Sequence, residues 1–192
     1  GEKGPKGLLM KNWPDFNIGH MSNPKYLGHF IEDGNMGVMT GWPSNKLIGI
    51  DFDDDDALEA FLDLNPELRE TATVKGQKGA KLFVRTDRVP KNGKIRNESG
   101  KDIGDLLSDG KQGVVHGTHP DGMKYQWVCE KPPASVDLDS LELPDGWTVP
   151  WIRPVEDQIA DKYGRPYQQL KDLTPGKLNE SFWAGLLYAK YI

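Results

Sequence analysis

Residues 48–53 of the chain read Ile-Gly-Ile-Asp-Phe-Asp, and three further aspartates, Asp54–Asp56, follow directly. The apolar residues predict a buried strand with two acidic residues at its carboxyl end. Side chains two positions apart on a strand point to the same face, so Asp51 and Asp53 would project together, about 7 Å apart. Two carboxylates held this close favour a shared divalent cation, which prefers oxygen ligands.

An acidic turn that begins a helix is the alternative interpretation of these aspartates. Residues 55–64 have apolar side chains at helical spacing, and aspartates suit the first turn of a helix. This explanation fits Asp54–Asp56 well, but it fits Asp51 poorly because apolar residues lie on both sides of Asp51. The sequence therefore predicts a metal site at Asp51 and Asp53 and a helix cap at the later aspartates.

Short apolar runs separated by turn residues predict a domain with many strands. We expect strands at residues 35–40, 47–52, 71–75, 81–86, 103–107, 114–115 and 125–128. The first two would form a hairpin, and a second hairpin would turn at Asp109-Gly110. With residues 55–64 as the one clear helix in the first half, the sequence predicts an α+β fold with a mostly antiparallel sheet and flanking helices.

Two C-terminal segments differ from the rest of the chain. Residues 131–172 are rich in proline with little periodicity, which indicates a segment that wraps the domain or leads out of it. Residues 173–192 end in a helical pattern, and the chain begins with glycine rather than methionine. We therefore expect a catalytic core at residues 1–130, a linker, and the start of a further helical domain of a longer polypeptide.

The composition is that of a soluble globular protein, with 36% hydrophobic and 28% charged residues and a net charge of −5. This acidic balance argues against coating of duplex DNA by charge alone, although basic residues gather between Lys75 and Arg96. No run approaches the roughly 18 apolar residues of a membrane span, and no secretory signal is visible. The single cysteine, Cys129, excludes an intrachain disulfide and a multi-cysteine zinc site. We expect a cytoplasmic protein without membrane contact.

A third carboxylate would complete a two-metal site, in which two ions activate one oxygen and stabilise another. Asp105 is the candidate, because it lies on a predicted strand shortly before a glycine-containing turn. Asp102 remains its rival, whereas Asp109 is better explained by its Asp-Gly turn.

A basic turn, Gly76-Gln-Lys-Gly79, joins two predicted strands. Its backbone N–H groups and Lys78 would suit a triphosphate, with a plain basic hairpin as the alternative. Lys81 and Arg85 on the second strand would face the same side.

Two histidines, His116 and His119, follow further along the chain. No cysteine or third histidine nearby supports a zinc set. A histidine that contacts phosphate or orders a loop is the better interpretation.

Together these motifs resemble the bifunctional primase–polymerase (prim-pol) domain of the archaeo-eukaryotic primase superfamily, found in plasmid and phage replication proteins. The resemblance covers roughly residues 1–130. It includes Asn35-Met-Gly-Val-Met-Thr-Gly41, Lys11-Asn-Trp13 and the Tyr-x-Trp pattern of residues 125–127. It implies an RRM-like primase catalytic core, a DNA primase and polymerase activity, a single-stranded DNA template, NTP or dNTP substrates, and two Mg²⁺ or Mn²⁺ ions.

The resemblance also implies roles for individual residues. Asp51, Asp53 and Asp105 match the catalytic, metal-binding acids of the family's first and third motifs. The resemblance, with the basic turn, assigns the triphosphate to Lys78, Lys81, Arg85 and His119. Lys81 stands where the family usually has a histidine that contacts the nucleotide. A lysine holds phosphate as a point charge but cannot act as a pH-tuned acid.

The C-terminal end of the chain adds an expectation about the domains that follow the core. Residues 174–183 are similar to the start of a small helical domain that often follows prim-pol cores and precedes a helicase, although Leu178 replaces the usual arginine.

Two other functions stay open: a metal-dependent nuclease, for which no Asp…Glu-x-Lys pattern is present, and a catalytically degenerate module that binds single-stranded nucleic acid.

Overall fold

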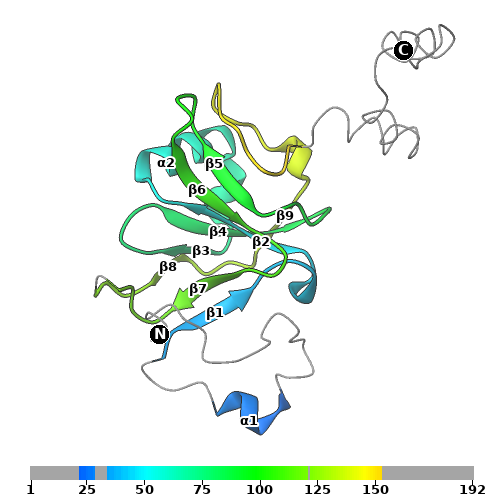
Figure 1. The fold of residues 1–192 in the computed structure, drawn as a ribbon, viewed down its shortest axis with the longest axis vertical. Helices are drawn as coiled ribbons and strands as arrows, with labels where there is room; N and C mark the ends of the chain where they lie inside the picture. The colour runs from blue at the N-terminus through cyan, green and yellow to red at the C-terminus, as the bar shows by residue number, and fades with distance from the viewer. Residues whose placement is uncertain (1–21, 29–33, 121, 153–192) are drawn as a thin grey trace, which may run out of the picture. The chain divides into compact units, whose positions relative to one another are not determined.

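The computed structural model describes residues 22–28, 34–120 and 122–152 (Figure 1). The strands are β1 (Met36–Met39), β2 (Leu47–Phe52), β3 (Thr73–Lys75), β4 (Ala80–Thr86), β5 (Gly93–Arg96), β6 (Asp102–Leu107), β7 (Gln112–His116), β8 (Gln126–Cys129) and β9 (Ala134–Val136). The helices are α1 (Pro24–Leu27), α2 (Asp55–Leu64) and the short 3-10 turns η3 (Trp42–Ser44), η4 (Pro66–Glu70) and η5 (Leu138–Ser140). None of these helices is long and apolar enough to cross a membrane.

A seven-stranded sheet forms the centre of the domain, in the order β5-β6-β2-β4-β3-β8, with β9 paired to β4. All neighbours along that order are antiparallel, and the β4–β9 pair is parallel. Strand β2 lies between β4 and β6, so the predicted Asp-x-Asp strand is central. The predicted α+β fold with a mostly antiparallel sheet is confirmed.

Helix α2 begins where the sequence predicted. The Asp54 side chain accepts a hydrogen bond of 3.0 Å from the Ala57 N–H, which is the usual geometry of a helix N-cap. Two more aspartates in the first turn add a favourable interaction with the helix dipole. The helix-cap interpretation is therefore confirmed for Asp54.

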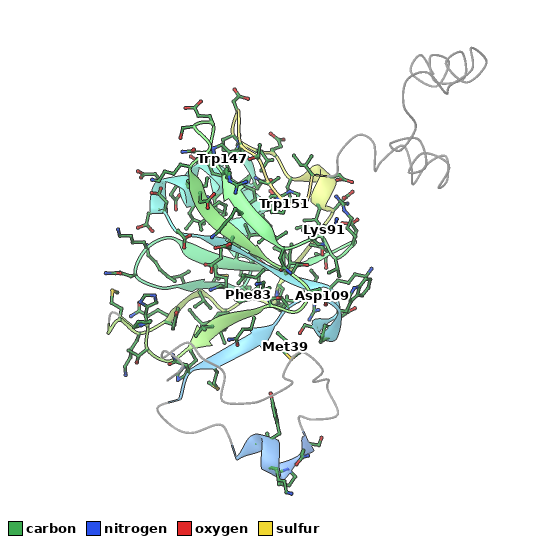
Figure 2. The ribbon with its side chains drawn as sticks, in the orientation of Figure 1. Met39, Phe83, Lys91, Asp109, Trp147 and Trp151 are labelled. Atoms are coloured by element: carbon green, nitrogen blue, oxygen red, sulfur yellow. The ribbon has the colours of Figure 1, made fainter. Side chains whose placement is uncertain are left out.

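The two faces of the large sheet carry separate apolar clusters. Alternate residues of β2, including Ile48 and Phe52, pack with α2 in the larger cluster, which also contains Trp151. The other face carries Leu47 and Phe83, covered by residues of the β1–β7 pair. Figure 1 shows α2 and the β1–β7 pair on opposite sides of the large sheet, and Figure 2 shows Phe83 on the side of that pair.

The sequence predicted a hairpin over residues 35–52 and another at Asp109-Gly110, and both predictions are wrong. Strand β1 pairs with β7 in a two-stranded sheet, and only an isolated bridge, Gly41–Leu47, links it to β2. Gly41 has a φ of 88° and precedes η3, so the chain is redirected before β2 begins. At Gly110, with a φ of 68°, the chain likewise passes from β6 in the large sheet to β7 in the small one.

The packed domain extends beyond the boundary predicted at residue 130. Strand β9 joins the large sheet, and Leu138, Leu141 and Trp151 are buried in its main cluster. The compact unit accordingly runs to Ile152. The proline-rich composition hid these contacts, because isolated apolar residues between prolines can be buried without periodicity. The predicted helical segment at residues 173–192 lies outside the described residues.

Candidate nucleotide and metal site

Four charged residues form a row across four neighbouring strands on one face of the large sheet. Lys94 of β5 pairs with Asp105 of β6, which pairs with Asp51 of β2, which pairs with Lys81 of β4. Directly paired residues of antiparallel strands present their side chains on the same face. The row therefore reads cation, anion, anion, cation, and the two carboxylates occupy its centre.

Each central carboxylate has a lysine partner. Lys81 Nζ lies 3.1 Å from Asp51 Oδ2, and the side chains of Lys81 and Asp51 keep only 10% and 30% of their exposure. Lys94 Nζ lies 2.7 Å from Asp105 Oδ2 at a more exposed position. The ammonium groups of Lys81 and Lys94 thus neutralise the two central carboxylates.

Two glycines make room for the Lys81 side chain. A Cβ atom at Gly113 of β7 would lie 2.7 Å from Lys81 Cδ, and one at Gly49 of β2 would lie 3.6 Å from the same atom. The aliphatic part of Lys81 therefore runs through a narrow passage between the two sheets. This passage directs its ammonium group to Asp51.

Burial and two neighbouring carboxylates raise the pKa of Asp51, whereas Lys81 lowers it. The neighbouring carboxylates are those of Asp53 and Asp105, and the net result is a pKa of Asp51 above its ordinary value. For Lys94, the hydrogen bond to Asp105 is the main cause of a raised pKa. The ionised form of Asp51 is thus under electrostatic stress, which a further cation would relieve.

A cavity of about 220 Å³ opens beside this row. Its lining includes Asp51, Asp53, Lys78, Lys81, His119 and Tyr125. The β3–β4 turn forms one wall, and Gly79 at its end has a φ of 56°. A side chain at Gly79 would collide with the Phe52 carbonyl, so glycine allows the turn to pack against the end of β2.

The donor set fits a hard divalent cation. Asp51, Asp53 and Asp105 supply carboxylate oxygens, which Mg²⁺ and Mn²⁺ prefer. In the part of the chain that the structure describes, no three His, Cys, Asp or Glu side chains already form a metal cluster. Asp51 and Asp105 each form an ion pair with a lysine instead.

The structure separates two residues from the site. Asp102 forms an ion pair of 2.8 Å with Arg96, and the register places Asp105, not Asp102, opposite Asp51. Arg85 shares a face with Lys81 but lies four residues further along β4. Its guanidinium donates to the carbonyls of Ser44 and Asn45, so it braces the η3 turn.

The sequence predicted most residues of the cavity and the charged row, but it assigned no role in the site to Tyr125 or Lys94. Tyr125 lines the cavity, and its ring centroid lies 5.9 Å from that of His119. Lys94 could not be found without the β5 strand, which was not predicted. The register of β5 against β6 is the signal that places Lys94 beside Asp105.

The fold and the site define a class of protein: an α+β domain with a mostly antiparallel sheet, consistent with a primase core. The family model for the N-terminal domain of bifunctional DNA primase/polymerases matches residues 13–145. The chain belongs to this family, and the resemblance seen in the sequence is confirmed. The family supports primase and polymerase activity with DNA and nucleotides. The comparison with curated proteins gave no match.

Proposed function

We propose that this domain is a template-dependent DNA primase and polymerase that makes primers and extends them by two-metal nucleotidyl transfer in phage or plasmid replication. The observation that carries the proposal is the pairing of Asp51 with Asp105 beside a cavity that also contains Lys78 and Lys81. Carboxylates for metals and cations for phosphates thus lie within one small site.

Asp51, Asp53 and Asp105 would hold two Mg²⁺ or Mn²⁺ ions. When bound, such ions lower the pKa of an attacking hydroxyl and stabilise the charge that develops at the α-phosphate and on departing pyrophosphate. Asp51 would be the inner ligand of the set, because it is paired with Asp105 on β6 and the charge of Asp53 also acts on it. Its partial burial limits competition from water for its oxygens.

Lys78, Lys81 and His119 would bind the triphosphate. Lys78 comes from the β3–β4 turn, Lys81 from β4 and His119 from the loop before β8, so they reach the cavity from three elements. With a metal ion held by Asp51, the Lys81 ammonium would be available to a phosphate oxygen. Arg85 is not part of this set, because it donates to backbone carbonyls elsewhere.

Nucleotide incorporation on defined DNA tests the proposal. The protein is incubated with single-stranded template, with and without a primer, in the presence of NTPs, dNTPs and Mn²⁺. We expect extended and de novo products from the wild type, and losses of at least about 100-fold for Asp51→Ala and Asp53→Ala. Asp56→Ala is the matched control, because Asp56 is an exposed residue of the first turn of α2.

Two outcomes would contradict the proposal at different points. Absence of any product while the wild type still binds single-stranded DNA would favour a binding module, and cleavage without incorporation would favour a nuclease. Full activity of Asp51→Ala and Asp53→Ala would overturn the metal assignment even if the polymerase activity is real.

A further inference from the structure

An exposed tryptophan lies on the site face at the edge of the large sheet. Trp127 of β8 pairs with Val74 of β3, and Val74 pairs with Lys81, so Trp127 continues the row of Lys81 and Asp51. Trp127 is 41% exposed, whereas Val74 beside it is 2% exposed. With neighbouring strands about 4.8 Å apart, Trp127 is about 10 Å from Lys81 and about 14 Å from Asp51 across the sheet.

Aromatic surface connects this tryptophan to the cavity. Tyr125 precedes Trp127 by two residues, and it both lines the cavity and packs against the cluster that contains Val74. Two positions apart on an extended chain, Tyr125 and Trp127 face the same side of the sheet edge, and we call this pair the aromatic track. The track begins where the triphosphate would bind and ends at the open edge of the sheet.

The charges along the track suit a polyanion. Lys78 and Lys81 both line the cavity at one end of the track. A flat π-face with nearby ammonium groups is the combination that binds unpaired nucleobases and their phosphates. Aromatic side chains on the open face of a sheet stack on bases in the same way in RRM domains.

We propose that Trp127 stacks on a nucleobase of single-stranded DNA and, with Tyr125, guides the template strand toward Asp51. This inference rests on the proposed function and names a residue contact for its template. Stacking tolerates any base, since every base has a π-face. The contact accordingly supplies affinity and position without sequence preference.

Binding of a fluorescent single-stranded oligonucleotide, without metal or nucleotide, tests the contact on the full chain. Loss of one stacked base is worth about 1–3 kcal/mol, so Trp127→Ala should weaken binding about 5- to 150-fold. Trp127→Phe keeps a flat ring and should stay within about threefold of wild type. Trp127→Leu keeps an apolar side chain without a π-face and should behave like Trp127→Ala.

Trp42→Ala is the matched control. Trp42 is 63% exposed and lies in η3. This turn precedes the N-terminal end of β2, whereas Asp51 lies near the C-terminal end of that strand. We expect its affinity for the oligonucleotide to equal that of wild type. The ratio of the wild-type and Trp127→Ala affinities should also stay constant between roughly 50 and 200 mM salt, while both affinities fall as counterions compete for phosphate contacts.

The inference is overturned if Trp127→Ala binds like wild type, if Trp127→Leu binds as well as Trp127→Phe, or if Trp42→Ala loses as much affinity as Trp127→Ala. These outcomes are distinguishable from failure of the proposed function. Trp127-dependent binding by a protein that incorporates no nucleotide refutes only the polymerase activity. Nucleotide incorporation with binding that does not depend on Trp127 refutes only the stacking contact.

Discussion

Replacing Lys81 with methionine isolates the charge that neutralises Asp51. Methionine retains most of the length and apolar character of the lysine stem, which runs past Gly49 and Gly113. The substitution therefore removes the ammonium group that lies 3.1 Å from Asp51 Oδ2 with little loss of packing. Asp51 is left partly buried beside two other carboxylates, Asp53 and Asp105, which already raise its pKa.

The size of the effect follows from the exposure of the pair. At 3.1 Å and an effective dielectric constant of about 20, the attraction is about 5 kcal/mol, much of it offset by desolvation of both ions. Removing one partner of a fully buried pair costs about 3–5 kcal/mol. Because Asp51 keeps 30% of its exposure, we expect Lys81→Met to lower the free energy of unfolding by about 2 kcal/mol, or the Tm by about 4–8 °C.

Thermal unfolding without metal measures this loss, and Lys75→Met is the matched control. Lys75 Nζ lies 2.7 Å from Asp55 Oδ1, but both side chains are about half exposed, so its loss should cost less than about 1 kcal/mol. Equal stability of the two variants would refute the reasoning.

The pH dependence of the Lys81→Met deficit has a defined sign. The folded-state pKa of Asp51 is already raised in the wild type, and it rises further without Lys81. The destabilisation is therefore complete at pH values above the pKa that Asp51 has in the folded variant. It disappears as the pH falls below the ordinary value of 3.8, because Asp51 is then protonated in the folded and unfolded states alike. A deficit that grows on acidification would contradict this cause.

Three further predictions concern the turn, the surface and the metal. Gly79→Ala should cost at least about 2 kcal/mol in thermal unfolding, because φ is positive there and the new methyl group meets the Phe52 carbonyl. Burial opposes ionisation of Asp87, but the Leu138 N–H and Arg88 outweigh it and lower its pKa. Asp87→Asn should therefore lose up to about 1 kcal/mol at pH 7, and acid titration of unfolding should show the loss shrinking below pH 3.8 and vanishing only below the lowered pKa of the folded state. Mn²⁺ at about 100 times its Kd should stabilise the wild type by about 2.7 kcal/mol in the same assay, and Asp53→Asn by less than half of that.

The elements that the sequence predicted best have strong local signals. Strand β2 and helix α2 occupy the residues expected for them, because an apolar run and a helical period mark them and Asp54 caps the helix. The hairpin of β3 and β4 was also predicted, since glycines bound a short turn between two apolar runs. These features depend on neighbours in the sequence.

The features that were missed depend on partners far along the chain. A turn at Asp109-Gly110 shows that the chain changes direction, but not that β7 leaves the large sheet to pair with β1. Strand β5 has a single buried residue, Ile95, and β9 has only three residues, so neither produces an apolar pattern. Both are strands because neighbouring strands offer them backbone partners.

The same limit applies to the site. Period-two alternation correctly placed Lys81 and Arg85 on one face, but it could not show that Arg85 lies at the far end of β4, against the η3 turn. Lys94 is opposite Asp105 only through the register of β5 and β6. Local sequence therefore drew attention to the acids and the basic turn, whereas the ion pairs of Asp51 with Lys81 and of Asp105 with Lys94 depend on the register of the sheet.

The proposed metal site at Asp51 and Asp53 is tested most directly by anomalous diffraction at the manganese edge from crystals soaked in Mn²⁺. We predict a peak at about 2.1 Å from carboxylate oxygens of both residues, the distance typical of Mg²⁺ sites. Lys81 should then have moved away from Asp51 Oδ2, since the ion replaces its charge. Manganese bound only at Asp54–Asp56, with the Lys81–Asp51 ion pair intact, would contradict the assignment of the catalytic centre.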